Sequence, residues 1–387
     1  MKKATFLLLA IFVLLLAGCE KDPEGNARTS EDTTATAAPY VLQLDPADRS
    51  QSIRCLNFVE TNEGCYYGWQ KSMNGGNGWG DFIYFCPRGE ATWYPLCNKP
   101  NCQHKDKNCN AYIGGYFGYY DGALYTTDDR MGSIDVVKMN LDGTDHQVVA
   151  NVKLKQRGGY EWMFHHGKFL LRSNNFNFQI EEMPDYLIIL DLADGSQTEP
   201  LDEYLQTEKL PTFFDYYYKE KVFGYGQNND PSLTEFDMAT GEIKKRDIGN
   251  ITGFYATDSI LYYYLPKENE VDGKKLEAGF WEYDLESETA KYCGLPAEDI
   301  AWISYDEDYI YAGTSVNPEE DEVLYILSRD YKVIDRIELE KGCNYAAAAS
   351  DRLYFATNNL TKLENYYVDK SQIGSGNLQL IPMDVVG

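Results

Sequence analysis

One local pattern recurs along most of this chain, at intervals of about 45 residues. An aromatic segment leads into a short polar turn, and an apolar run that usually ends in tyrosine follows it, as in residues 119–125, 255–262 and 305–311. The apolar anchors of that second run are Ile83, Leu124, Phe169, Val222, Leu261, Ile310 and Leu353. A repeat of about this length is typical of units that cannot bury both faces alone and therefore stack on their neighbours.

A second pattern follows several of these anchors. An apolar run is followed by Asp or Asn, another apolar residue and a Gly turn in residues 138–143, 190–195 and 236–241. Asp-Gly and Thr-Gly supply the positive φ that a tight hairpin requires, so we interpret this motif as a third strand that turns into a fourth. No long segment shows helical periodicity. The sequence therefore predicts an all-β fold, a β-propeller of about seven four-stranded blades, with six and eight as alternatives.

The beginning of the repeat region is expected to close the ring. We place the propeller domain at residues 40–387, and its last repeat ends soon after residue 381. An N-terminal strand from residues 40–44 or 53–59 is predicted to complete the ring, because closure removes two exposed sheet edges.

The composition agrees with strands and narrows the range of partners. The chain has 32 tyrosines, and aromatic residues make up 14% of it, which excludes wholesale disorder. The net charge of −26 argues against nucleic acid as a partner, and against an anionic membrane surface bound by bulk electrostatics.

Residues 1–18 have the features of a bacterial export signal. Two lysines precede an apolar run that is too short for a comfortable transmembrane helix, and the run ends in the sequence LAGC, with Cys19 last. This ending resembles the lipobox of bacterial lipoproteins. The resemblance implies lipidation of Cys19 and an exported protein that is anchored to the extracytoplasmic face of the membrane by lipid alone; an ordinary signal peptide is the alternative. Residues 19–39 are expected to form a flexible tether.

Two further segments resemble a known family. They are residues 138–145, KMNLDGTD, and residues 96–111, LCNKPNCQHKDKNCNA. Both are similar to segments of lipid-anchored β-propeller proteins of Gram-positive bacteria, a domain of unknown function related in shape to the TolB-type propeller. The resemblance implies a fold and a location, but no activity.

The chain has nine cysteines, and eight remain when the lipidated one is set aside. In an exported protein we expect disulfides within the cluster formed by Cys55, Cys65, Cys86, Cys97, Cys102 and Cys109, with the pairing left open. The densest constellation is Cys97, Cys102, His104 and Cys109. Three thiolates and an imidazole can form a closed structural zinc site, although the four-residue gaps do not match a common zinc module. Zinc and free thiols therefore stand as alternatives, and no other cofactor is expected.

Aromatic residues at equivalent places in successive repeats are a second candidate site. They are Phe117, Trp162, Phe214, Phe254, Trp302 and Tyr345. At one mouth of a propeller channel they could stack on sugars or peptides, whereas between neighbouring blades they would be core residues; we favour core packing.

These features lead us to expect a cell-surface lipoprotein that acts as a non-catalytic binding or scaffolding propeller for a protein, peptide or glycan. The alternatives are a polysaccharide-active enzyme (a glycosidase or lyase), with carboxylates around the propeller channel, and a structural envelope subunit. The sequence has no nucleophile elbow, phosphate loop or His-Glu-x-x-His motif, so an enzyme is the less favoured interpretation.

Overall fold

The computed structural model describes residues 57–73, 79–130, 132–154, 159–165, 167–174, 187–199, 216–219, 221–225, 232–237, 240, 242–257, 259–317, 319–357 and 364–386. All of them belong to one compact unit, Val41–Gly387. The export signal, the tether and Cys19 lie outside the described residues, as do Cys55 and Phe214. Among the described residues, no helix is long and apolar enough to cross a membrane.

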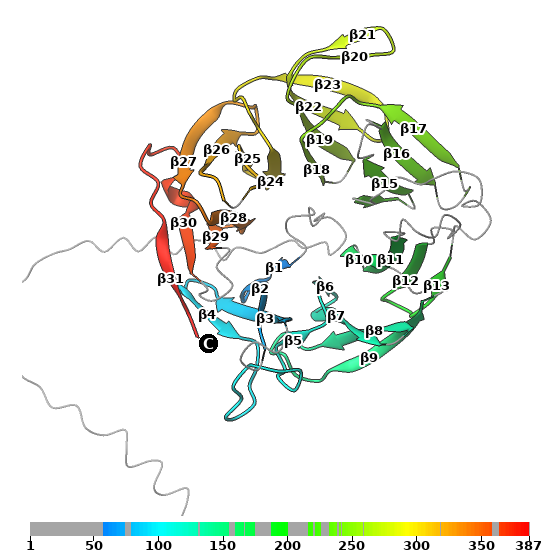
Figure 1. The fold of residues 1–387 in the computed structure, drawn as a ribbon, viewed down its shortest axis with the longest axis vertical. Coiled ribbons are helices and arrows are strands. Elements are labelled where there is room, and N and C mark those ends of the chain that lie inside the picture. The colour runs from blue at the N-terminus through cyan, green and yellow to red at the C-terminus, as the bar shows by residue number, and fades with distance from the viewer. Residues whose placement is uncertain are drawn as a thin grey trace, which may run out of the picture. The chain divides into compact units, whose positions relative to one another are not determined.

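The unit is a β-propeller whose sheets follow one another around a ring (Figure 1). Five separate sheets each contain four antiparallel strands, and a nine-stranded sheet contains two further four-stranded runs, β1–β4 and β28–β31. The first run consists of β1 (Phe58–Glu60), β2 (Gly64–Ser72), β3 (Trp79–Pro87) and β4 (Thr92–Pro95), and β5 (Tyr112–Ile113) also pairs with β3.

The five separate sheets continue the ring in chain order. The first two sheets are formed by β6 (Phe117–Tyr120), β7 (Ala123–Arg130), β8 (Ser133–Met139) and β9 (Gln147–Lys153), and by β10 (Gly159–His165), β11 (Lys168–Asn174), β12 (Leu187–Asp191) and β13 (Gln197–Thr198). The third and fourth are formed by β14 (Tyr216–Tyr218), β15 (Lys221–Tyr225), β16 (Ser232–Asp237) and β17 (Ile243–Asp247), and by β18 (Gly253–Thr257), β19 (Ile260–Leu265), β22 (Gly279–Asp284) and β23 (Thr289–Gly294). The fifth is formed by β24 (Trp302–Tyr305), β25 (Tyr309–Gly313), β26 (Glu322–Ser328) and β27 (Val333–Leu339). A separate hairpin, β20 (Asn269–Val271) and β21 (Lys274–Leu276), leaves the fourth of these sheets between β19 and β22.

The last run returns to the first. It consists of β28 (Cys343–Ala348), β29 (Arg352–Thr357), β30 (Asn365–Asp369) and β31 (Ile381–Val385), with a short 3-10 helix, η2 (Lys370–Gln372), after β30. All seven repeat anchors are buried, and they lie in β3, β7, β11, β15, β19, β25 and β29. Six of them occupy the second strand of a four-stranded run, and each predicted Gly turn follows a third strand. The sequence repeat therefore corresponds to the repeated four-stranded antiparallel unit.

The hydrophobic core lies between neighbouring sheets. One cluster, for example, joins Tyr125 and Val136 of the β6–β9 sheet to Phe169 and Ile188 of the β10–β13 sheet. Because a four-stranded sheet has two apolar faces and no other layer to cover them, each sheet buries its faces against the sheets on either side.

The contact between the first and last runs differs from the expected one. Strand β31 runs parallel to β4, and the backbone N–H groups of Asp384 and Val386 donate to Ala91 O at 3.0 Å and Trp93 O at 2.9 Å. The predicted closing strand at residues 53–59 is wrong for its described part, because Phe58–Glu60 forms β1 and pairs with β2 inside the first run. Residues 40–44 lie outside the described part of the chain.

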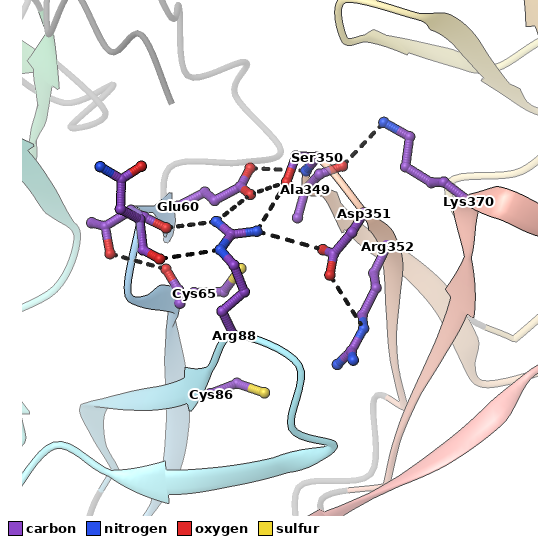
Figure 2. A network of polar contacts seen from close by, with 12 residues as sticks. Glu60, Cys65, Cys86, Arg88, Ala349, Ser350, Asp351, Arg352 and Lys370 are labelled. Carbon is purple, nitrogen blue, oxygen red and sulfur yellow. Dashed lines mark hydrogen bonds and ion pairs between the residues drawn. The ribbon is translucent and has the colours of Figure 1, made fainter. Parts of the chain in front are cut away.

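Polar side chains also bridge these two runs (Figure 2). The carboxylate of Glu60 is buried, and it accepts hydrogen bonds from Arg88 Nη2 and from the backbone N–H of Ser350, both at 2.9 Å. Arg88 also donates to the Ser350 hydroxyl at 3.1 Å and approaches Asp351 at 4.0 Å. The buried Glu60 carboxylate is thus bound by Arg88 of its own run and by Ser350 in a turn of the last run.

Candidate metal centre

The cysteine-rich segment interrupts the outer strand of the first run. Strand β4 pairs with one half of β3 and β5 pairs with the other half, so the two short strands continue the same edge. The N–H of Leu96 donates to Ile83 O at 2.9 Å, and the N–H of Ile83 donates to Ala111 O at 2.8 Å. The chain therefore leaves the sheet and returns to it opposite a single residue, and the residues between form an insertion, which we call the cysteine loop (residues 97–110).

Four side chains of this segment come together. The sulfur atoms of Cys97, Cys102 and Cys109 and a ring nitrogen of His104 all lie within 4.8 Å of one another. His104 Nδ1 lies 3.3 Å from Cys109 Sγ. Among the described residues, this is the one group of three or more potential metal ligands that gathers in this way.

Tight turns bring the four ligands to one place. The N–H of Cys102 donates to Lys99 O at 3.2 Å, and the N–H of Cys109 donates to Asp106 O at 3.1 Å. Each of these cysteines therefore ends a turn. His104 has a φ of 51°, in the left-handed region that non-glycine residues seldom adopt. The backbone is thus bent sharply at a ligand position, which is a feature that functional sites often share.

The thiols influence one another electrostatically. Burial raises the pKa of Cys97, but hydrogen bonds from the backbone amides of Lys99 and Asn110, and from the Cys102 and Cys109 thiols, bring this pKa below its ordinary value. Burial, together with the neighbouring Cys97 and Cys102, raises the pKa of Cys109 to about 12. The backbone amides thus favour one thiolate, whereas a second negative charge is opposed by the first.

The cluster rests on the core of the first run. Cys109 is buried in it together with Leu96 and Ile113, and Cys97 and Cys102 pack against it. The segment KMNLDGTD, residues 138–145, lies against Leu96 of this core. Its Gly143 approaches the Leu96 backbone so closely that an added Cβ would lie 2.3 Å from Leu96 O. Gly143 has a φ of +75°, so the turn requires glycine for its backbone conformation as well as for this close approach. The two segments that carry the family resemblance are therefore neighbours in space.

A lysine from outside the cysteine loop lies beside the cluster. Lys71 of β2 donates to Tyr84 Oη at 2.9 Å and lies over the Phe82 ring. Burial lowers the pKa of His104, and the positive charge of Lys71 lowers it further. No motif in the sequence could have assigned Lys71 to the site, because two strands, β3 and β4, separate it from the first ligand. The signal that was present is the charge of the segment at 96–111, which has three lysines against one aspartate in a strongly acidic chain.

The expected disulfides are not found. In the part of the chain that the structure describes, Cys65, Cys86, Cys97, Cys102, Cys109, Cys293 and Cys343 are free. Cys65 and Cys86 lie opposite each other in β2 and β3, yet they form no bond. The prediction was wrong because the number of cysteines and the cell compartment do not determine which side chains meet. The loop brings three thiols and an imidazole to one place, and it does not arrange the cysteines in disulfide-bonded pairs.

The candidate ligand-face aromatics occupy innermost strands. Phe117, Trp302 and Tyr345 are buried, and Trp162 and Phe254 are half-buried. The rings of Trp302 and Tyr345 stack across neighbouring sheets with centroids 4.9 Å apart, and Trp302 Nε1 donates to the buried Glu322 carboxylate at 2.5 Å. The described members of this set therefore contribute to packing between sheets.

Comparisons with known proteins give the fold. No family model and no curated protein match this chain. A solved structure of a prolyl endopeptidase is similar over 84% of this chain and 49% of its own, with a TM-score of 0.54 and 11% identity. An acylaminoacyl peptidase is similar over 84% of this chain and 52% of its own, with a TM-score of 0.48 and 13% identity. The β-propeller domain of the Trilobed protease from Pyrococcus furiosus covers 80% of this chain and 92% of its own length, with a TM-score of 0.44 and 11% identity.

These similarities correct the expected function. The chain spans about half the length of the prolyl endopeptidase whose fold it shares. The expectation of a non-catalytic binding or scaffolding propeller is contradicted by this similarity to a peptidase. The sequence did not reveal this likeness, because the two chains are only 11% identical.

Proposed function

We propose that this chain takes part in peptide hydrolysis, as the propeller of a peptidase. The observation that carries the proposal is the similarity of its fold, over 84% of its length, to a prolyl endopeptidase. In the two prolyl endopeptidases of that study, inter-domain dynamics has a role in catalysis and specificity. By analogy, we infer that the propeller of this chain helps to select peptides for a hydrolytic centre.

The charge of the chain indicates which peptides it would favour. A net charge of −26 attracts cations over several ångströms and raises their concentration near the surface at low ionic strength. We therefore propose basic peptides as the preferred substrates.

The buried thiols of Cys65 and Cys86 are poor candidates for the nucleophile. Burial raises the pKa of Cys86 to about 11 and also raises the pKa of Cys65 well above its ordinary value, so both stay protonated near neutral pH. Because the thiolate is the reactive form, the proposal does not assign bond cleavage to these two cysteines.

The test compares membranes of the bacterium that makes this protein with membranes of a deletion strain and a complemented strain. Internally quenched basic peptides should be cleaved by wild-type membranes, the activity should fall in the deletion strain, and complementation should restore it. Raising the salt concentration should slow cleavage of basic peptides more than cleavage of neutral ones. Equal peptide hydrolysis in all three strains would overturn the proposal.

We further propose that the chain is exported and is anchored at the cell surface by lipid on Cys19. The support is the sequence of residues 1–19 alone. Mass spectrometry of the mature N-terminal peptide should show a diacylglyceryl group on this cysteine, and processing should be sensitive to globomycin. An unmodified Cys19 in the mature protein would contradict the anchor.

A further inference from the structure

The geometry points to a structural zinc site at the outer strand of the first run. We infer that Cys97, Cys102, His104 and Cys109 bind one zinc ion, and that this ion fixes the base of the cysteine loop so that β4 and β5 continue one strand. This inference is independent of the proposed peptidase role.

The donor atoms suit a tetrahedral ion. With zinc–sulfur bonds of about 2.3 Å, two sulfur ligands of a tetrahedral site lie about 3.8 Å apart. The four donor atoms here already lie within 4.8 Å of one another, and the His104–Cys109 pair lies at 3.3 Å. Small rotations of the side chains therefore bring all four to bonding distance. Three sulfurs and one imidazole nitrogen complete the coordination, so no position remains for water or substrate and the site is structural.

A disulfide explains the same residues less well. Three thiols within reach of one another can form one disulfide at most, which leaves one thiol and the imidazole without a role. A zinc ion engages all four donors. The backbone amides that hydrogen-bond to Cys97 also match this role, because a thiolate ligand is stabilised by such donors.

The surroundings balance the charge of the site. Three thiolates and one zinc ion carry a net charge of −1, which is costly next to an apolar core. Lys71 lies beside the cluster, and Lys99, Lys105 and Lys107 belong to the loop itself. These positive charges offset the negative charge of the site.

The site also has a mechanical consequence. The loop leaves and re-enters the edge of β3 opposite Ile83, so the ion holds together the two ends of an insertion that would otherwise pull apart. Strand β4, on one side of the loop, is also the strand that pairs with β31 of the last run. Loss of zinc is therefore expected to loosen the outer strand of the first run and, through it, the junction between the first and last runs.

Metal content is the first test. The mature exported protein is purified without chelators, and zinc is measured by elemental analysis. We expect about one zinc ion per chain in the wild type and at least a tenfold loss in Cys109→Ser and His104→Ala. Cys293→Ser, which changes a half-buried cysteine far along the chain, is the matched control and should keep its zinc.

A second variant guards against misfolding. His104→Cys keeps four donors and should retain about one zinc ion per chain, whereas His104→Ala should not. Reconstitution with cobalt should give the thiolate-to-metal charge-transfer bands and strong visible bands of a tetrahedral site. Wild-type protein that takes up neither metal after reduction and reconstitution would overturn the inference, and so would native protein in which two of the three cysteines resist alkylation until a disulfide is reduced.

Hydrogen exchange tests the mechanical part. Removal of zinc from the wild type should speed exchange in residues 92–96 and 381–386 at least tenfold, while β16, in a sheet on the opposite side of the ring (Figure 1), keeps its protection. If zinc is bound but its removal leaves exchange unchanged in these segments, the ion does not fix the strand and that part of the inference is wrong.

Discussion

At the scale of single residues, Glu60 is the acid whose burial needs most explanation. Its side chain is 4% exposed, and it forms an ion pair with Arg88 at 2.9 Å. The N–H and the hydroxyl of Ser350 donate further hydrogen bonds to it. A buried carboxylate is tolerated when its oxygens are satisfied in this way, and its energetic effect becomes visible when one partner is removed.

We therefore predict that Glu60→Ala lowers the free energy of unfolding by about 2–3 kcal/mol, because Arg88 and Ser350 lose a buried charged acceptor. Urea denaturation followed by circular dichroism measures the change. Glu338→Ala is the control, because Glu338 is 74% exposed and its contact with Arg336 is long, at 3.4 Å; this variant should shift stability by less than about 0.5 kcal/mol. Similar effects of the two substitutions would contradict the role of the buried network.

The candidate metal ligands could be found from the sequence, whereas their use could not. The close spacing of Cys97, Cys102, His104 and Cys109 marks them as a group, and local turns bring such residues together without distant partners. The choice between sulfur–sulfur bonds and a metal depends on the direction of each side chain, which spacing does not contain. Lys71 escaped prediction for a related reason, because strand pairing alone places it beside the cluster.

At the scale of elements, the strand pattern was predictable except where the first run departs from it. Six repeat anchors lie in second strands, but Ile83 lies in the third strand, β3. The cysteine loop enters the outer strand of this run and disturbs the spacing to the following repeat. The pairing of β31 with β4 was not predictable either, because parallel neighbours at opposite ends of a chain share no turn that the sequence could show.

This pairing can be tested at a single amide. In Val386→Pro the N–H that donates to Trp93 O is lost, and we predict a decrease of about 1–2 kcal/mol in the free energy of unfolding. Val386→Ala keeps the N–H and trims a side chain that is 45% exposed, so its stability should change by less than about 0.5 kcal/mol. Thermal unfolding of both variants against the wild type decides the matter. If both variants unfold at the wild-type temperature, the β4–β31 contact does not support the ring.

At the scale of the whole molecule, the repeat accounts for much of the unusual composition. The second strands place four tyrosines at buried positions in the clusters between sheets: Tyr125, Tyr262, Tyr311 and Tyr354. A tyrosine has a large apolar body and a hydroxyl that can reach a polar partner, so it suits a sheet whose two faces are covered but whose ends meet water. Tyr311 Oη, for example, hydrogen-bonds to Asp306.

The buried tyrosines make the molecule sensitive to alkaline pH. Burial raises the pKa of Tyr84 to about 12, and it also raises the pKa values of Tyr263, Tyr311 and Tyr354 above the ordinary value. An unfolded tyrosine ionises near pH 10, so the unfolded chain releases protons first as the pH rises. The stability is therefore complete below about pH 10 and falls above it, by about 1.4 kcal/mol per pH unit for each buried tyrosine.

Because several tyrosines act together, we predict that the folded protein unfolds cooperatively between about pH 10 and pH 12 instead of titrating group by group. Tyrosinate absorbance and far-ultraviolet circular dichroism, recorded on the same samples, should change over the same narrow range of pH. The chain in urea is the control, and its tyrosines should titrate smoothly near pH 10. A folded protein that reaches the full tyrosinate absorbance while its strand signal persists would show that the tyrosine hydroxyls reach water, and that burial between the sheets does not govern their ionisation.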